Sequence, residues 1–391
     1  MKPLIALILF FSCLSAYAQK DNRIVIGTTD IVYSKILNEK RVVLVHVPHG
    51  DKDQRYPVLY ILDGEDHFQS AVAIDEQLSG VLPDLIIVGI TNTVRERDLT
   101  PTVVSTQGGS GGGEHFMDFI EKELMPYIDS HYPTAPYRVL SGHSLGGLTV
   151  MNAFFNHNTL FNAYIAIDPS LWWDGQQWIK KQEAGLPKLD LKNKSLFVAI
   201  ANNIPAGLDT NTVQNDKSGM SLVTQAVLPF VHYLKDQKPK GLRWAYKFYP
   251  TERHGTVELA AEYDALHYLF DYYHFGTVQF VGHPELDEDS VMEAHFKLVS
   301  ERLGYKASPT EDLINEMGYD CMAMHKMTVA YKFFKRNVDN YPNDANAYDS
   351  LGDYYNDTGD KQKAIDAYAK SLSLHETADT RRKMEGLKGK K

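Results

Sequence analysis

Residues 142–147 read Gly-His-Ser-Leu-Gly-Gly, and Ser144 among them is the candidate nucleophile of this chain. The serine lies in a G-x-S-x-G pattern, which is typical of a sharp turn from a strand into a helix. Glycines at the flanking positions let the strand and the helix approach each other closely. The pattern predicts that the Ser144 hydroxyl lies at a helix N-terminus, where the helix dipole and free N–H groups favour a developing oxyanion.

A serine hydroxyl needs a general base to become a nucleophile at neutral pH. His254 is the best placed of the 15 histidines, because it follows the strand pattern at 242–248 and precedes a helical pattern at 257–270. A loop that leads from the last strand into the last helix is where a catalytic histidine should lie, at the same sheet edge as Ser144. His143 adjoins the serine, but adjacent residues of such a turn point away from each other, so we do not expect it to act as the base.

The acid that would orient His254 is not settled by the sequence. It should follow the strand at 196–200, yet residues 201–203 read Ala-Asn-Asn. Asp209 and Asp216 lie further along the same loop and are the preferred candidates. Asp168, which ends the preceding strand, and Glu252 are less favoured alternatives. Any of these four carboxylates could instead be a turn or capping residue. A Ser–His dyad without a carboxylate is the remaining alternative.

An oxyanion hole needs two N–H donors, one of them from the residue after the nucleophile. We therefore expect the Leu145 amide to be one donor. The other should be the Glu65 amide, with Gly64 beside it, in the turn after the strand at 58–62.

Trp172 and Trp173 follow another strand end, where loops build a substrate pocket. They could form a wall for an aromatic or sugar-like acyl group, or they could belong to the core, since buried tryptophan is ordinary.

The elements that must position these residues alternate along the chain. Short apolar runs, several of them rich in β-branched residues, predict doubly covered parallel strands; they lie at 42–47, 58–62, 85–90, 139–140, 163–167 and 196–200. Helical patterns lie between them, the clearest at 116–128. The run at 242–248 alternates more and suits a strand nearer the sheet edge. Together they predict a three-layer α/β sandwich.

The pattern changes after about residue 280. An acidic, polar stretch precedes a wholly helical region in which Leu351, Gly352 and Ala364 match the offsets of a tetratricopeptide repeat, and a looser copy lies one period upstream. We expect four parts: a signal peptide at 1–18, an α/β-hydrolase domain at 23–278, a linker with a capping helix at 279–310, and a small all-α tetratricopeptide-like domain at 311–385.

The first 18 residues have the features of a signal peptide. Lys2 supplies a positive charge, residues 4–14 are apolar, and Ala16-Tyr17-Ala18 forms an A-x-A cleavage site. The apolar stretch is too short to span a bilayer stably. We therefore predict a periplasmic or secreted bacterial protein with no membrane insertion after signal removal. Of the two cysteines only Cys321 would then remain, so we expect no internal disulfide.

Composition also narrows the set of ligands. A net charge of −10 without a basic cluster argues against nucleic acid as a partner. The chain has no H-E-x-x-H motif and no paired cysteines, so we expect no metal and no cofactor. The expected partners are a small-molecule ester and, through the C-terminal repeats, a protein.

Four segments resemble the putative esterase family of α/β-hydrolases, which includes esterase D, feruloyl and acetyl-xylan esterases, and enterochelin (siderophore) esterases; they lie at 58–64, 142–147, 170–173 and 252–255. The resemblance covers about residues 25–275, and the siderophore-esterase branch is the most similar. It implies Ser144 as nucleophile, His254 as base and carboxylic-ester hydrolysis without a cofactor. The chain departs from the family at 201–203, where relatives often carry a carboxylate.

Two hypotheses follow. The first is an exported serine esterase that forms an acyl-enzyme, with siderophore esters or acylated glycans as substrates. The second is a catalytically inactive hydrolase fold that binds partners through its helical repeats. The serine–glycine turn and His254 favour the esterase, whereas the unassigned acid favours the binding protein.

Overall fold

The structure is a computed structural model that describes residues 24–48, 54–276 and 287–389. The predicted signal peptide at 1–18 and the acidic stretch before residue 287 lie outside the described residues. No helix of the described part combines the length and the apolar character needed to cross a bilayer.

One eight-stranded sheet organises the larger part of the chain, with the strand order β1-β2-β4-β3-β5-β6-β7-β8. The first two strands pair antiparallel, β2 pairs antiparallel with β4, and all later pairs are parallel. The strands are β1 (Thr28–Ser34), β2 (Glu39–His46), β3 (Tyr56–Leu62), β4 (Ile86–Ile90), β5 (Thr134–His143), β6 (Ala163–Ile167), β7 (Lys194–Ala201) and β8 (Leu242–Tyr249).

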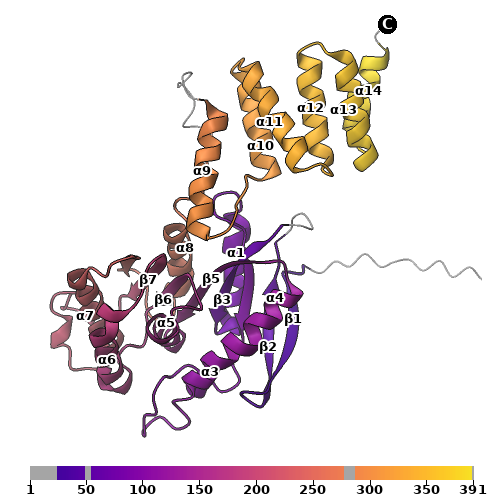
Figure 1. Ribbon diagram of the computed structural model, residues 1–391. Helices are drawn as coiled ribbons and strands as arrows, with labels where there is room; N and C mark the ends of the chain where they lie inside the picture. The colour runs from indigo at the N-terminus through magenta and orange to yellow at the C-terminus, as the bar shows by residue number, and fades with distance from the viewer. Residues whose placement is uncertain (1–23, 49–53, 277–286, 390–391) are drawn as a thin grey trace, which may run out of the picture.

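Helices cover both faces of this sheet (Figure 1). One face packs against α1 (Gly64–Gln77) and α8 (Val257–Leu269). The other face packs against α3 (Gly113–Phe119), the π-helical turn η1 (Ile120–Leu124), α4 (Met125–His131), α5 (Leu145–Asn156), α6 (Gln177–Gly185) and α7 (Leu222–Gln237). Short helical turns lie in the loops: α2 (Arg95–Asp98), η2 (Trp173–Gln176), η3 (Leu186–Lys188) and η4 (Val213–Asn215).

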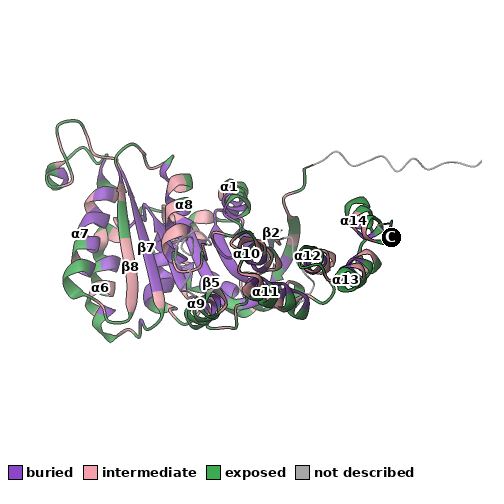
Figure 2. Ribbon diagram, turned by 90° about the horizontal axis from the view of Figure 1, so that it is seen from above, coloured by how far each residue is buried: buried purple, intermediate pink, exposed green. Residues whose placement is uncertain are grey.

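The alternation of side chains along the central strands explains the two cores. In β3, every residue of which is buried, Tyr60 and Leu62 point into one core and Leu59 and Ile61 into the other. In contrast β8, at the sheet edge, is mostly half-buried, as Figure 2 shows. The predicted three-layer α/β sandwich and the predicted edge strand are therefore confirmed.

The C-terminal part is helical throughout its described length, from residue 287 on. Its helices are α9 (Glu288–Leu303), α10 (Glu311–Ala323), α11 (Met327–Asn340), α12 (Ala345–Asp357), α13 (Lys361–Leu374) and α14 (Ala378–Gly389).

The same close contact recurs in two successive helix pairs of this part. A Cβ at Gly318 would lie 2.6 Å from the Phe334 ring, and one at Gly352 would lie 2.5 Å from the Tyr368 ring. A repeated glycine-to-aromatic contact fits the predicted tetratricopeptide-like repeat, and that assignment and the domain boundaries remain predictions.

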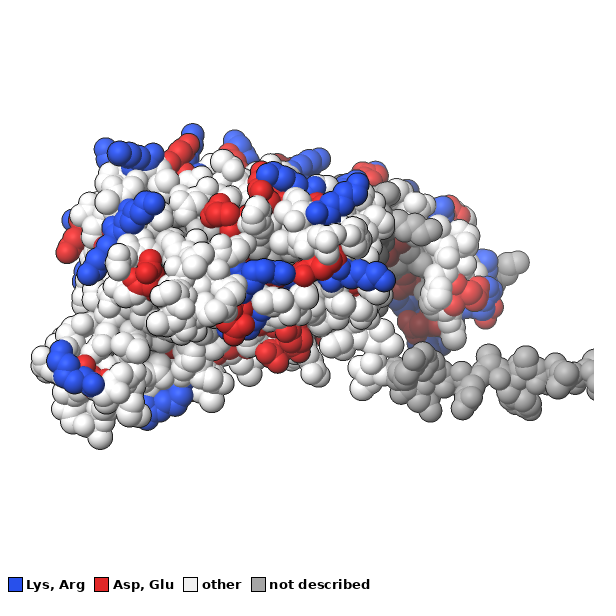
Figure 3. Space-filling model, turned by 90° about the horizontal axis from the view of Figure 1, so that it is seen from below, with Lys and Arg blue, Asp and Glu red and all other residues white. Residues whose placement is uncertain are grey.

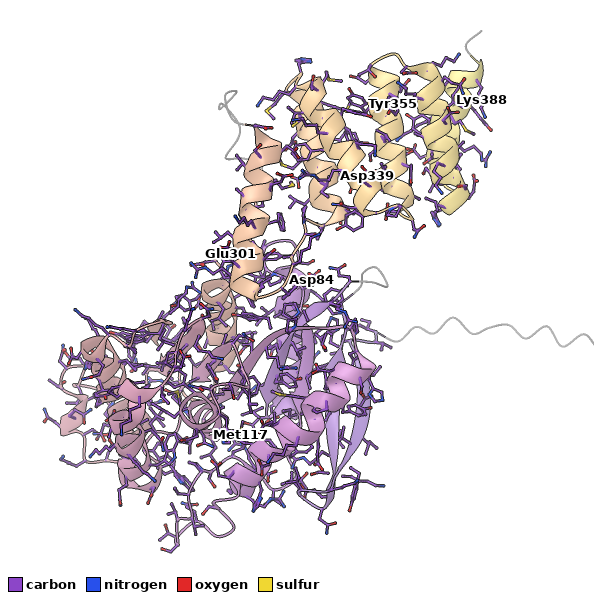
Figure 4. The ribbon with its side chains drawn as sticks, viewed as in Figure 1. Asp84, Met117, Glu301, Asp339, Tyr355 and Lys388 are labelled. Carbon is purple, nitrogen blue, oxygen red and sulfur yellow. The ribbon has the colours of Figure 1, made fainter. Side chains whose placement is uncertain are left out.

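Helix α9 joins the two parts. Met292 and Phe296 in its first half and middle pack with α10, α11 and α12, whereas Val299 and Leu303 at its end pack with the core beneath α1 and α8. Figure 4 labels Glu301 on this helix, at the junction. Helix α9 thus contacts both the helices that follow it and the sheet domain, and its expected role as a cap remains a prediction.

The junction lies away from the candidate site. A cavity of about 1040 Å³ there is lined by residues at the amino ends of β3 and β5, including Arg55 and Ala135, together with residues after α9 such as Tyr305. The C-terminal helices therefore meet the sheet domain at the amino-terminal edge of the sheet, opposite the carboxyl edge from which Ser144 emerges.

Candidate active site

Ser144 forms the turn between β5 and α5 with an unusual backbone conformation. Its φ is 61° and its ψ is −115°, in a region that residues with a side chain rarely adopt. The Ser144 N–H donates to the Ile167 carbonyl of β6 (3.0 Å), and the Ser144 carbonyl accepts from the Leu148 N–H of α5 (3.0 Å). These bonds hold the strained residue in place, as is common at functional sites.

The glycines of the motif permit this turn. A Cβ at Gly142 would lie 2.6 Å from the carbonyl carbon of Gly146, which belongs to the first turn of α5. A Cβ at Gly147 would lie 2.9 Å from the Cα of Pro169. Strand β5 and helix α5 therefore approach too closely for a side chain at Gly142, as predicted, and the loop after β6 leaves no room for one at Gly147.

The structure brings Ser144 and His254 together with Asp168. The Oγ atom of Ser144 lies 3.0 Å from Nε2 of His254, and Nδ1 of the same ring lies 2.6 Å from Oδ2 of Asp168. The Asp168 side chain is fully buried, whereas the His254 side chain is 37% exposed. Because the carboxylate can only accept, the imidazole carries its proton on Nδ1 and offers Nε2 to the serine hydroxyl. This arrangement can withdraw the serine proton during attack on an electrophile.

The expectation that Asp209 or Asp216 contacts His254 is wrong. Both carboxylates bind within their own turns: Asp209 accepts from the N–H groups at 211 and 212, and Asp216 accepts from Ser218 and Ser221. Hydrogen bonds from Thr212 and from Ser218, respectively, lower the pKa of these two groups. The alternative Glu252 accepts from the Thr256 hydroxyl (2.8 Å). All three are turn carboxylates in this structure.

Asp168 is the acid that contacts His254 because of the order of the strands in the sheet. It directly follows β6, which lies between β5 and β7 in the sheet, so its carboxylate lies next to the strand end that carries Ser144. The sequence offered one signal for it, since Asp168 immediately ends the apolar run at 163–167. The sequence alone favours a carboxylate in the loop after the next strand, β7.

Three donors hold the Asp168 carboxylate. Oδ1 accepts from the Ala201 N–H (2.9 Å), and Oδ2 accepts from Nδ2 of Asn203 (3.1 Å) in addition to Nδ1 of His254. A buried carboxylate is costly unless hydrogen bonds replace its lost hydration. The contribution of Asn203 was not foreseen from the sequence.

Two buried groups lie beneath the site. The His143 ring packs against His254, with centroids 4.5 Å apart, and burial lowers the pKa of His143 to about 4. The Ser141 hydroxyl of β5 donates to Oε2 of Glu262 on α8 (2.5 Å), and burial raises the pKa of Glu262 to about 8. Both groups are therefore neutral near pH 7. The second contact ties the helix after His254 to the strand before Ser144.

The predicted oxyanion donors lie at two helix N-termini. Leu145 is the first residue of α5, and Gly64 and Glu65 begin α1; N–H groups of a first turn have no acceptor within their helix. Asp63 lies at the start of α1 with a φ of 54°, and Oδ2 of its carboxylate would be 3.2 Å from a Cβ at Gly146. The two helix starts are thus neighbours. Their service as oxyanion donors remains a prediction.

Side chains that were not singled out by the sequence hold the start of α1. The Arg95 guanidinium donates two hydrogen bonds to Asp63, at 2.6 Å and 2.8 Å, and Nδ2 of Asn92 donates a third at 2.6 Å. A Cβ at Gly64 would lie 2.5 Å from the backbone of Gly89 in β4, so α1 begins directly against the sheet.

The two tryptophans differ in exposure. Trp173 is 2% exposed, belongs to the core, and donates from Nε1 to the Thr102 hydroxyl (3.0 Å). Trp172 is half-buried and tilts against it, with ring centroids 6.0 Å apart. Only Trp172 has surface to offer as a pocket wall.

Ser170, which begins this segment, lies beside the nucleophile. Its Oγ is 3.3 Å from Oγ of Ser144, and its N–H donates to the Ser144 carbonyl (3.0 Å). Since Ser144 donates its hydroxyl proton to His254, Ser170 is the donor between the two serines. The sequence pattern alone does not indicate this contact of Ser170.

Within the described residues, His, Cys, Asp and Glu side chains do not gather in groups of three that could hold a metal ion. On the face shown in Figure 3, basic and acidic side chains are interspersed, and no large area carries one sign of charge.

The chain is similar in sequence to proteins that are named as esterases. Residues 34–213 match the family described as "Putative esterase". The chain is 33% identical over 139 residues to the siderophore triacetylfusarinine C esterase of Aspergillus fumigatus, covering 30% of this chain and 45% of that protein. It is 33% identical over 170 residues to the ferri-bacillibactin esterase BesA of Bacillus subtilis, covering 37% of this chain and 58% of that protein. The matches thus span about half the length of these curated relatives.

A solved structure extends the likeness. The IroE-like serine hydrolase from Shewanella oneidensis is 32% identical, with a TM-score of 0.68, and the match covers 81% of this chain and 99% of that one. The fold, the serine turn and these matches together show that the chain belongs to the putative esterase family.

Proposed function

We propose that this protein is an exported serine esterase that hydrolyses carboxylic esters through an acyl-enzyme on Ser144. The observation that carries the proposal is the hydrogen-bonded series from Ser144 through His254 to the buried Asp168. The resemblance to named esterases supports the same chemistry.

Each group has one task in this mechanism. Ser144 Oγ attacks the ester carbonyl while its proton passes to Nε2 of His254, and Asp168 stabilises the resulting imidazolium. The amides of Leu145 and Glu65 stabilise the oxyanion. The imidazolium then protonates the departing alcohol, which leaves the acyl group on Ser144. Water attacks this acyl-enzyme with His254 again as base, releasing the carboxylic acid and restoring the serine.

Siderophore esters are the substrate class that we propose. The supporting relatives are named for siderophore esters, triacetylfusarinine C in one case and ferri-bacillibactin in the other. The half-buried Trp172, two residues after Ser170, has ring surface to offer to a flat aromatic group of the substrate such as a catechol. Export rests on the sequence of residues 1–18, and binding of a protein partner by the repeats rests on their resemblance to tetratricopeptide repeats.

The rival hypothesis of an inactive binding protein loses its main support. It depended on the absence of a carboxylate after β7, and the structure instead has Asp168 against His254.

A panel of p-nitrophenyl, feruloyl and catecholate-siderophore esters tests the proposal. We expect turnover by the wild-type protein, fastest on the siderophore ester, and a loss of at least roughly 10⁴-fold in Ser144→Ala. Equal, negligible turnover of every ester by wild-type protein would overturn it.

A further inference from the structure

The turn that follows β7 is bonded to the loop that carries His254. The Asn202 N–H donates to the Glu252 carbonyl (2.8 Å), and its Nδ2 donates to the Pro250 carbonyl (2.8 Å). The Arg253 guanidinium donates to the Asn202 carbonyl. The end of β7 therefore fixes the backbone on which His254 lies.

Asn203, the next residue, contacts both partners of the predicted relay. Its Nδ2 donates to Oδ2 of Asp168 (3.1 Å), and its Oδ1 accepts from the His254 N–H (3.0 Å). A carboxylate can only accept and a backbone N–H can only donate. The side chain at 203 must therefore offer one donor and one acceptor at the same time, which an amide does and a carboxylate does not.

We propose that Asn203 is a positioning residue for the Ser144–His254–Asp168 relay, an inference that rests on the esterase function proposed above. By bonding Oδ2 of Asp168, the amide turns that oxygen toward Nδ1 of His254. By accepting from the His254 N–H, it fixes the backbone from which the imidazole extends. One side chain thereby sets the distance between acid and base.

An aspartate at 203 has the same shape as asparagine and the wrong electrostatics. Its ionised oxygen would replace a donor 3.1 Å from the buried Asp168 carboxylate, so two like charges would face each other. When both carboxylates are ionised, their excess negative charge favours the charged imidazolium of His254, which cannot act as a base. The Asn203→Asp variant therefore tells whether the Asn203 side chain acts through its hydrogen bonds or only by filling space.

The experiment compares Asn203→Asp and Asn203→Ala with wild-type protein, measuring kcat, KM and their pH dependence on one activated ester. Asn215→Asp is the matched control, since it adds the same charge at an exposed position of η4. Thermal melting of each variant separates a loss of fold from a loss of alignment. Labelling of wild-type protein by a fluorophosphonate probe tests the underlying function separately.

We expect kcat to fall roughly 10- to 100-fold in both Asn203 variants, with KM and the control nearly unchanged, because one hydrogen bond to a charged group is lost. In Asn203→Asp we also expect the acid limb of the pH–rate profile to move up by about one unit. An Asn203→Asp enzyme within about twofold of wild type, with an unmoved acid limb, would overturn the inference while leaving the esterase intact. Absence of labelling and turnover in wild-type protein would instead overturn the function on which it rests.

Discussion

Replacement of Asp168 by asparagine removes the charge that holds His254 in its reactive tautomer. In the wild-type structure both oxygens of the carboxylate accept: one from Ala201, the other from Asn203 and His254. Asparagine at 168 has one oxygen for these three donors, and its NH₂ group would face another donor. The imidazole then turns its unprotonated nitrogen toward the amide and presents Nε2–H to Ser144, which leaves the serine without a base.

The expected loss in kcat is large. A histidine in the wrong tautomer with its geometry otherwise intact costs roughly 10³- to 10⁴-fold, which corresponds to about 4–5.5 kcal/mol in the activation free energy. The upper part of this range applies because Asp168 is 0% exposed, so water cannot replace the missing charge.

The assay is steady-state hydrolysis of an activated ester by Asp168→Asn, with thermal melting to establish that the variant is folded. Asp209→Asn and Asp216→Asn are matched controls, because each removes a loop carboxylate that bonds only within its own turn in the contacts described here. We expect both controls to stay within about twofold of wild type, as surface changes usually do.

Retention of more than a tenth of wild-type kcat by Asp168→Asn would refute the assignment of Asp168 as the acid. A loss in Asp209→Asn or Asp216→Asn as large as that in Asp168→Asn would refute it as well.

Three further predictions concern the turn, the buried acid and the pocket. Gly142→Ala should lower the free energy of unfolding by about 1–3 kcal/mol, because the new methyl would lie 2.6 Å from the Gly146 backbone; an unchanged urea midpoint would contradict this. The pKa of Glu262 is about 8 in the folded protein and about 4.3 in the unfolded chain. The contribution of Glu262 to the free energy of unfolding therefore falls as the pH rises between these two values. The Tm of Glu262→Gln relative to that of wild type should therefore rise from pH 5 to pH 8. A Tm difference that stays constant over this range would refute the raised pKa of Glu262. Trp172→Ala should raise KM for aromatic esters about tenfold with little change in Tm, whereas Trp173→Ala should cost about 3–5 kcal/mol of stability; equal effects on KM would contradict the assignment of only one wall.

The sequence predicted the sheet domain well because its signals are local. A buried parallel strand is a short apolar run, and the G-x-S-x-G motif requires glycines where backbone meets backbone, as at Gly142. His254 was found for the same reason, since it lies between a strand and a helix that are both visible in the sequence.

The acid could not be chosen in this way. Asp168, Asp209 and Asp216 all follow strands or lie in strand-end loops, and what separates them is the lateral order of β5, β6 and β7 together with the path of the loop after β7. Strand order and loop path are long-range features that produce no local sequence pattern. Asn203 was missed for a related reason: its significance depends on two partners that are distant in sequence.

Covalent labelling shows directly whether Ser144 is a reactive nucleophile. Wild-type protein is treated with a fluorophosphonate probe, digested, and searched by mass spectrometry for the modified peptide. We expect modification at Ser144, with none in Ser144→Ala and a much slower reaction in Asp168→Asn. An unmodified Ser144 in folded wild-type protein, or equal labelling of Ser144→Ala, would contradict the role of Ser144 as nucleophile.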